Sequence, residues 1–264
     1  MQNLKKLISS LCITALFLGS PILMDHAKDV YLAEIVAKKA NPVKYKGRVF
    51  GSSFQLKYSG HTVTVTNHHV CNVMRKIMFD KDLTEIIKQV EKLEKTKMSK
   101  SAIKKWYQDQ ALRLTRKKYN IIGQSLSIGE YSRTILYESK SHDICFLSPT
   151  GGPSFSLASS VHRGEAVTII GHPRGHEQSI SDGRITGSEF NPHPTMGIVV
   201  RSLKSTALAF PGNSGSPVVN RYGNVVGILY AGYPSDFTNV NFVVPLEYIK
   251  ADFEQYLYER NTSK

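Results

Sequence analysis

Short β-strands separated by turn residues account for most of the sequence, and this pattern restricts the fold more than any other feature. Apolar and polar residues alternate from Val49 to Tyr58, and again around Val63 and Val65 after a Ser-Gly turn. Alternation with a period of two predicts the half-buried strands of a hairpin. Because no βαβ alternation follows, we predict an all-β barrel architecture. Further strands are expected at 134–137, 143–147, 166–171, 178–185, 197–203, 218–219, 225–229 and 240–244.

Two segments have a helical period instead. Apolar side chains recur every three or four residues within about 80–119, which predicts two helices joined near Met98. Residues 246–258 form a second amphipathic pattern and predict a C-terminal helix. We interpret the first segment as a helical insertion in the β-architecture and the second as a tail. The expected apolar face of the tail consists of Leu246, Ile249 and Phe253.

The N-terminus has the layout of a signal sequence. Two lysines precede an apolar stretch of 18 residues from Leu7 to Met24, and charged residues resume at Asp25. Polar residues, glycine and proline dilute this stretch, and no clean cleavage site follows it. We therefore expect residues 1–27 to be either a signal peptide or an uncleaved membrane anchor, followed by a linker over 28–46. Both alternatives place the rest of the chain outside the cytoplasm.

Positive charge is concentrated in the helical insertion. The chain has 34 Lys and Arg against 21 Asp and Glu, and the segment from Arg75 to Lys118, with 14 basic and 6 acidic residues, supplies +8 of the net +13. One interpretation is a solvated helical hairpin on the rim of a barrel. The other is a surface that docks an anionic membrane or an acidic partner, with Trp106 and Tyr107 as apolar anchors. Nucleic acid is not an expected partner.

The three cysteines, Cys12, Cys71 and Cys145, are too few for a disulfide framework. Cys71 and Cys145 lie in apolar sequence, so we expect buried free thiols and no bridge. Neither has the spacing of a metal ligand, and no motif indicates a cofactor. We expect a protein without metal or cofactor.

The segment Pro211-Gly-Asn-Ser-Gly-Ser-Pro-Val218 places a serine between two glycines. Glycine permits a tight turn that can direct the Ser214 hydroxyl outward and point the backbone amides of Gly212 and Ser214 at one position. Such a pair of amides is an oxyanion hole, which stabilises the negative oxygen formed in acyl transfer. The alternative interpretation is a polar hairpin turn between two strands.

A histidine and an aspartate occur at the ends of two other predicted strands. His69 follows a strand in Thr-Asn-His-His-Val, and Asp143 begins the run Asp-Ile-Cys-Phe-Leu. A serine hydroxyl needs a base such as histidine to become a nucleophile, and the imidazole needs a carboxylate on its other nitrogen. Separately, His69 could be a structural histidine and Asp143 a strand-start cap. Together with the serine turn, they predict a triad of His69, Asp143 and Ser214.

In this order, the segments resemble the trypsin-like serine peptidases, and among them the bacterial Deg-type and glutamyl-endopeptidase-like enzymes. The similarity runs from Gly47 to about Leu257. An α/β-hydrolase would have the order Ser, Asp, His and a Gly-x-Ser-x-Gly motif, whereas position 216 is serine. The resemblance implies a chymotrypsin-like fold of two six-stranded antiparallel β-barrels, the first over 47–150 and the second over 151–245. We expect no PDZ module after the final helix.

The resemblance also implies an activity, the hydrolysis of peptide bonds in proteins or peptides through an acyl-enzyme intermediate. A substrate chain would pair with the strand that follows the nucleophile. Leu229 stands where glutamyl endopeptidases have a histidine that reads acidic side chains, so specificity for glutamate is not expected. The expected substrate contacts are Leu208, Leu229, Tyr230 and Ala231.

A second function remains open at this point. The chain could be a catalytically silent peptidase-like scaffold that binds an anionic partner through the basic insertion at 80–119. The presence of all three triad residue types favours the active endopeptidase over this alternative.

Overall fold

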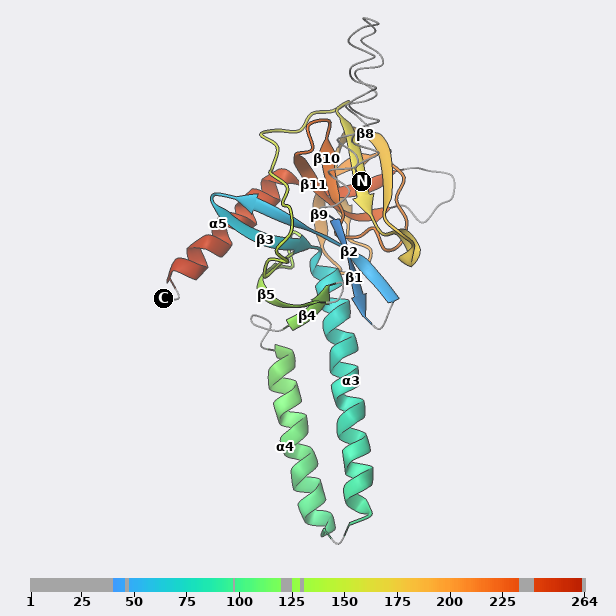
Figure 1. The fold of residues 1–264 in the computed structure, drawn as a ribbon, viewed down its shortest axis with the longest axis vertical. Coiled ribbons are helices and arrows are strands. Elements are labelled where there is room, and N and C mark those ends of the chain that lie inside the picture. The colour runs from blue at the N-terminus through green and yellow to red at the C-terminus, as the bar shows by residue number, and fades with distance from the viewer. Residues whose placement is uncertain are drawn as a thin grey trace, which may run out of the picture.

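The computed structural model consists of two β-units that follow one another along the chain, a long helical hairpin and a C-terminal helix (Figure 1). The segment predicted to be a signal peptide or anchor, at 1–27, lies outside the described residues. The structure describes residues 40–45, 48–96, 98–119, 125–128, 131–232 and 240–262.

The first β-unit is a six-stranded antiparallel sheet. Its hydrogen-bonded order is β1-β2-β3-β6-β5-β4, and the two outer strands, β1 and β4, lie next to each other, so that the sheet curls around its core. The strands are β1 (Ala40–Tyr45), β2 (Arg48–Tyr58), β3 (His61–Thr66), β4 (Ser125–Ile128), β5 (Tyr131–Ser139) and β6 (Ile144–Leu147).

The second β-unit is a closed six-stranded barrel with the order β10-β11-β12-β9-β8-β7. All its neighbouring strands pair antiparallel. The two units confirm the predicted chymotrypsin-like, antiparallel fold. The strands are β7 (Ala166–Gly171), β8 (Ser179–Pro192), β9 (Val199–Ser205), β10 (Pro217–Asn220), β11 (Val225–Gly232) and β12 (Asn241–Pro245).

Strand β1 lies within the segment that the sequence assigned to a linker, 28–46. It pairs with β2 along its whole length, and its register shifts after Val43. Val43 is buried in the same apolar cluster as Val70, which lies at the start of the helical hairpin. Pro42 removes one backbone donor, a loss that an edge strand tolerates. The strand forms because the edge of β2 offers backbone partners and an apolar cluster receives Val43. Neither feature can be recognised from the six residues of the strand alone.

One apolar cluster extends across both β-units and the C-terminal helix. Phe54 of β2 meets the ring of Phe155 edge-on, with ring centroids 5.7 Å apart, and Phe155 lies in the segment that joins the two units. That segment also forms parallel bridges to each unit, at Leu56 and at Val225. Each fully buried large apolar side chain contributes about 1.5–3 kcal/mol to stability. The shared core therefore fixes one unit against the other.

The C-terminal helix α5 (Leu246–Thr262) starts at the end of β12 and packs back on the first β-unit. Phe253 lies 5.4 Å from Tyr58 and 5.3 Å from Phe146, measured between ring centroids. The predicted apolar face of Leu246, Ile249 and Phe253 is buried, as expected.

The helical insertion is a hairpin of α3 (His68–Glu94) and α4 (Lys100–Tyr119), which projects away from both β-units (Figure 1). The prediction of two helices is confirmed, but the predicted start near residue 80 is wrong. Residues His68 to Glu94 form one continuous helix of 27 residues. Among the described residues, no helix is both long and apolar enough to cross a lipid bilayer.

Cys71 and Cys145 form a disulfide, and both residues are fully buried. The expectation of free thiols is therefore wrong. The pairing depends on tertiary structure, because β6 lies against β3 and places Cys145 opposite Thr66. The first turn of α3 then brings Cys71 close enough, with a Cα–Cα distance of 6.7 Å.

We predict that replacing both Cys71 and Cys145 by serine lowers the free energy of unfolding. The bridge spans 74 residues, and the chain-entropy estimate for a loop of that length is about 4 kcal/mol. Urea denaturation measures the change. The reduced wild-type protein should match the double variant, and Cys12→Ser should unfold like wild type. An unchanged unfolding midpoint in the double variant would contradict a structural bridge.

Candidate active site

Asp143 occupies the turn that leads into β6 and is completely buried. Its φ angle of 56° lies in the left-handed region, which aspartate tolerates better than most residues. Asn67, the residue before α3, donates from its side-chain amide to the Asp143 carbonyl oxygen at 3.0 Å, in place of capping its own helix. The turn is thus attached to the N-terminus of α3.

His69 lies in the first turn of α3 and contacts both oxygens of the Asp143 carboxylate. Its backbone N–H donates to Oδ1 at 2.9 Å, and its ring Nδ1 lies 2.8 Å from Oδ2. The carboxylate therefore serves as an anionic cap for the helix and as the partner of the imidazole. The ring is partly exposed, with 19% of the side chain accessible, whereas the carboxylate is inaccessible. Nδ1 is held by Asp143, which leaves Nε2 for another partner.

The pKa of the Asp143 carboxyl lies below its ordinary value. Burial on its own would raise that pKa, but hydrogen bonds from His193 and His69, positive charge on His69 and the His69 backbone N–H together outweigh it. The site therefore holds a buried carboxylate at neutral pH.

The serine turn depends on close approaches that only glycine permits. A Cβ on Gly215 would lie 2.1 Å from the carbonyl oxygen of Ser52, and the φ angle of Gly215 is 87°. A Cβ on Gly51 would lie 2.9 Å from the Ser214 carbonyl oxygen and 2.8 Å from a methyl group of Val70. The β2 backbone at Gly51 is therefore wedged between the serine turn and the residue that follows His69.

Ser52 of β2 connects the serine turn to the first β-unit. Its N–H donates to the Ser214 carbonyl oxygen at 2.7 Å, and its own carbonyl accepts from the Thr66 hydroxyl at 2.8 Å. Its hydroxyl donates to the Gly212 carbonyl at 3.0 Å and accepts from the His172 N–H at 3.1 Å. No sequence motif marks Ser52, because its contacts with His172, Gly212 and Ser214 join residues more than 100 positions apart.

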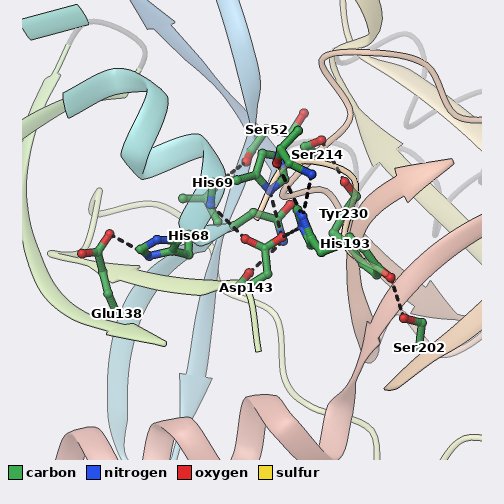
Figure 2. A network of polar contacts seen from close by, with 12 residues as sticks. Ser52, His68, His69, Glu138, Asp143, His193, Ser202, Ser214 and Tyr230 are labelled. Atoms are coloured by element: carbon green, nitrogen blue, oxygen red, sulfur yellow. Dashed lines mark hydrogen bonds and ion pairs between the residues drawn. The ribbon is translucent and has the colours of Figure 1, made fainter. Parts of the chain in front are cut away.

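Figure 2 shows Ser214 beside the His69–Asp143 pair, together with His193. The Ser214 hydroxyl donates to the carbonyl oxygen of Tyr230 at 3.3 Å. Within the described part of the chain, Ser214 and His69 share no hydrogen bond.

The Gly212 and Ser214 amides belong to a turn in which Gly212 has a φ angle of 100°. A Cβ at Gly212 would lie 2.5 Å from the carbonyl oxygen of His172, so the turn accepts only glycine there. Over the residues that the structure describes, neither of these two N–H groups donates to the protein backbone outside helices and strands. Both are available to an external acceptor.

The four residues expected to contact a substrate divide into two pairs. Leu208 is 48% exposed and Ala231 is partly exposed, so both can be reached from solvent. The Leu229 side chain is instead buried in the core of the second barrel. The Tyr230 ring is also buried, and its hydroxyl lies 2.6 Å from the Ser202 hydroxyl. Only their backbones face the serine turn: Leu229 exchanges hydrogen bonds with Gly215 and Ser216, and the Tyr230 carbonyl accepts from Ser214.

His193 is a site residue that the sequence analysis missed. It follows the last residue of β8, is buried, and places Nε2 3.0 Å from Oδ2 of Asp143. No motif surrounds it, and a histidine in a Pro-rich hairpin gives no signal for this contact. His68, next to the proposed base, points to the other side and pairs with Glu138 at 3.3 Å (Figure 2).

His69, Asp143 and His193 offer one donor atom each within 4.8 Å of one another, a spacing that a metal ion could use. In this structure, however, Oδ2 of Asp143 already accepts from both imidazoles. We therefore describe the three residues as a hydrogen-bonded network. Cys71 and Cys145 lie close to Glu138 but are joined to each other.

Comparison with known proteins defines the class. The sequence profile described as "Trypsin-like peptidase domain" matches residues 51–228, about two thirds of the chain. The chain therefore belongs to the trypsin-like peptidase family, a family of proteases that act on proteins or peptides. This confirms the resemblance found in the sequence.

Solved structures show the same fold. The chain is similar to the Rv3671c protease of M. tuberculosis in its inactive form, with a TM-score of 0.54, 14% identity, and coverage of 85% of this chain and 92% of that one. For the active form of that protease the values are 0.53, 14%, 84% and 82%. It is also similar to the serine endoprotease from Yersinia pestis, with a TM-score of 0.53, 15% identity, and coverage of 87% and 66%.

We predict that Asp143→Asn lowers the free energy of unfolding at pH 7 by about 1–3 kcal/mol. In the variant, the amide NH2 group would face N–H donors that contact a negatively charged oxygen in the wild-type protein. A carboxyl whose pKa is lowered by folding stabilises the protein above its unfolded-state pKa, about 3.9, and loses this contribution as the pH falls through the folded-state value. The difference between variant and wild type should therefore narrow below about pH 4. Urea denaturation at several pH values measures the free energy of unfolding of both proteins. A difference between them that does not change with pH would contradict an ionised Asp143.

Proposed function

We propose that this protein is a serine endopeptidase in which Ser214 is the nucleophile, His69 the general base and Asp143 the residue that orients the base. The observation that carries the proposal is the double contact of Asp143 with His69, through Oδ1 to the backbone N–H and Oδ2 to the ring. With Nδ1 held by the carboxylate, the imidazole can accept a proton only at Nε2.

The reaction follows from this arrangement. His69 Nε2 takes the proton from the Ser214 hydroxyl as the oxygen bonds to the peptide carbonyl carbon. The imidazolium, stabilised by Asp143, then gives that proton to the leaving amine as the peptide C–N bond breaks. Water releases the acyl group in a second round of the same transfers. The Gly212 and Ser214 amides would bind the oxyanion, because both are free for an external acceptor.

The test uses a fluorophosphonate probe, which phosphonylates an activated serine irrespective of the substrate. We predict that wild-type protein is labelled and that Ser214→Ala is not, with both proteins retaining the same thermal unfolding temperature. Ser188→Ala removes an exposed serine of β8 and should label normally. Labelling that persists in Ser214→Ala would exclude this residue as the nucleophile.

The same experiment separates the endopeptidase from the alternative, a catalytically silent scaffold, because a silent scaffold would not be labelled in any form. Docking of an anionic membrane or acidic partner by the hairpin stays a prediction. On the described part of the hairpin, exposed cations such as Lys88, Lys92 and Lys104 alternate with exposed anions such as Glu85 and Glu91. Retention on anionic vesicles measures whether the hairpin binds them.

We further propose that the protein works outside the cytoplasm. The N-terminal sequence has the layout of an export signal, and the Cys71–Cys145 disulfide suits an oxidising compartment. In cells that express the full chain, the protein should be recovered in extracytoplasmic or membrane fractions with Cys71 and Cys145 resistant to thiol alkylation. Recovery in the cytosol with both thiols reactive would contradict export.

A further inference from the structure

His193 joins the second barrel to a carboxylate that belongs to the first β-unit. Its backbone N–H donates to the Ile198 carbonyl at 2.7 Å, which closes the β8–β9 hairpin and fixes the start of the side chain. The ring then reaches Asp143, where Nε2 lies 3.0 Å from Oδ2, the same oxygen that contacts His69 Nδ1. Two imidazoles thus share one carboxylate oxygen from opposite β-units.

The hydrogen bonds of His193 determine which ring nitrogen carries the hydrogen. The backbone N–H of Thr195 points at Nδ1 from 3.3 Å. A backbone N–H can only donate, so Nδ1 is the acceptor and Nε2 carries the hydrogen. His193 therefore donates to Asp143 in its neutral form, and it does not compete with His69 for a proton in this arrangement.

The ring of His193 also has a fixed plane. It stacks on the Tyr230 ring with centroids 5.0 Å apart and an interplanar angle of 19°. The Ser202 hydroxyl, which bonds to the Val200 carbonyl at 3.1 Å, accepts from the Tyr230 hydroxyl at 2.6 Å and so holds that ring in place. The backbone carbonyl of the same tyrosine holds the Ser214 hydroxyl. One residue of β11 thereby supports both His193 and the proposed nucleophile.

We propose that His193 is a positioning residue for the reaction: it donates to Asp143 Oδ2 and holds the carboxylate in the orientation that aligns His69 with Ser214. This inference rests on the proposed function. The role is indirect, since His193 contacts the orienting carboxylate and not the reacting atoms. Loss of a hydrogen bond to a buried charge lets the carboxylate rotate and leaves it less well stabilised.

The groups that face this contact are few. Asp143 and His69 come from the turn before β6 and from α3, and Tyr230 comes from β11. Burial raises the pKa of the Tyr230 hydroxyl, and the negative charges of Asp143 and Glu189 raise it further. Tyr230 is therefore neutral at ordinary pH, and Asp143 is the negatively charged group to which His193 donates its hydrogen bond.

Two variants distinguish the contribution of the His193 N–H donor from that of its aromatic ring. His193→Phe keeps an aromatic ring to stack on Tyr230 and removes the N–H. His193→Gln removes the ring but carries an amide N–H about as far from the backbone as Nε2. The measured quantity is the second-order rate constant of fluorophosphonate labelling as a function of pH, which needs no identified substrate. Thermal unfolding and near-ultraviolet circular dichroism report whether each variant is folded.

We expect His193→Phe to label on the order of 10- to 100-fold more slowly than wild type at neutral pH, the loss that corresponds to a hydrogen bond to a charged group. We also expect the acid limb of its pH profile to move to higher pH. A carboxylate with one hydrogen-bond donor fewer attracts positive charge in the site more strongly. His193→Gln should restore most of the rate and return the acid limb toward that of wild type.

Equal rates and equal acid limbs for wild type and folded His193→Phe would overturn the inference. So would a His193→Gln profile that matches His193→Phe, because the ring and not the donor would then matter. Nitrogen-15 NMR of histidine-labelled wild type is an independent measurement: it should show His193 with hydrogen on Nε2, and hydrogen on Nδ1 would refute the assignment. Wild-type protein that is not labelled at all would instead overturn the proposed endopeptidase, while the NMR result would still test the contact.

Discussion

The arrangement of the site depends on one buried negative charge. An ionised carboxylate removed from water costs several kcal/mol unless donors replace the lost hydration. Asp143 meets this requirement with three N–H groups, of which two belong to His69 and one to His193. These donors come from the start of α3 and from the β8–β9 hairpin. The carboxylate therefore fixes α3, the turn before β6 and the β8–β9 hairpin relative to one another, and so connects the two β-units.

A second constraint is the closeness of backbones where the β-units meet. At Gly51 and Gly215 the missing side chains let the serine turn lie directly on β2, and Ser52 fills the contact with hydrogen bonds from its backbone and its hydroxyl. The shared core around Phe54 and Phe155 supplies the apolar part of the same interface. Polar contacts of Ser52 and apolar contacts around Phe155 thus act together to hold the Ser214 turn against β2.

Sequence reasoning located most of the strands, the two helical segments and the residues His69, Asp143 and Ser214, because alternation, helical period and turn chemistry are local properties. It failed where partners are distant. The Cys71–Cys145 bridge and the contact of His193 exist only after β6 pairs with β3 and the second barrel closes. It also placed the start of the first helix near residue 80, whereas α3 begins at His68, where the Asp143 carboxylate from a distant turn accepts from the His69 backbone N–H.

Continuity of α3 gives the hairpin a mechanical property. A helix of 27 residues is about 40 Å long, and its first turn contains His69 and the bridged Cys71. A tilt of such a rod would pivot about its first turn, where His69 lies. By simple geometry, a tilt of about one degree at the base displaces the far end by roughly 0.7 Å. The covalent link and the carboxylate cap together resist that tilt, so a load applied to the far end is borne by the same residues that align the imidazole.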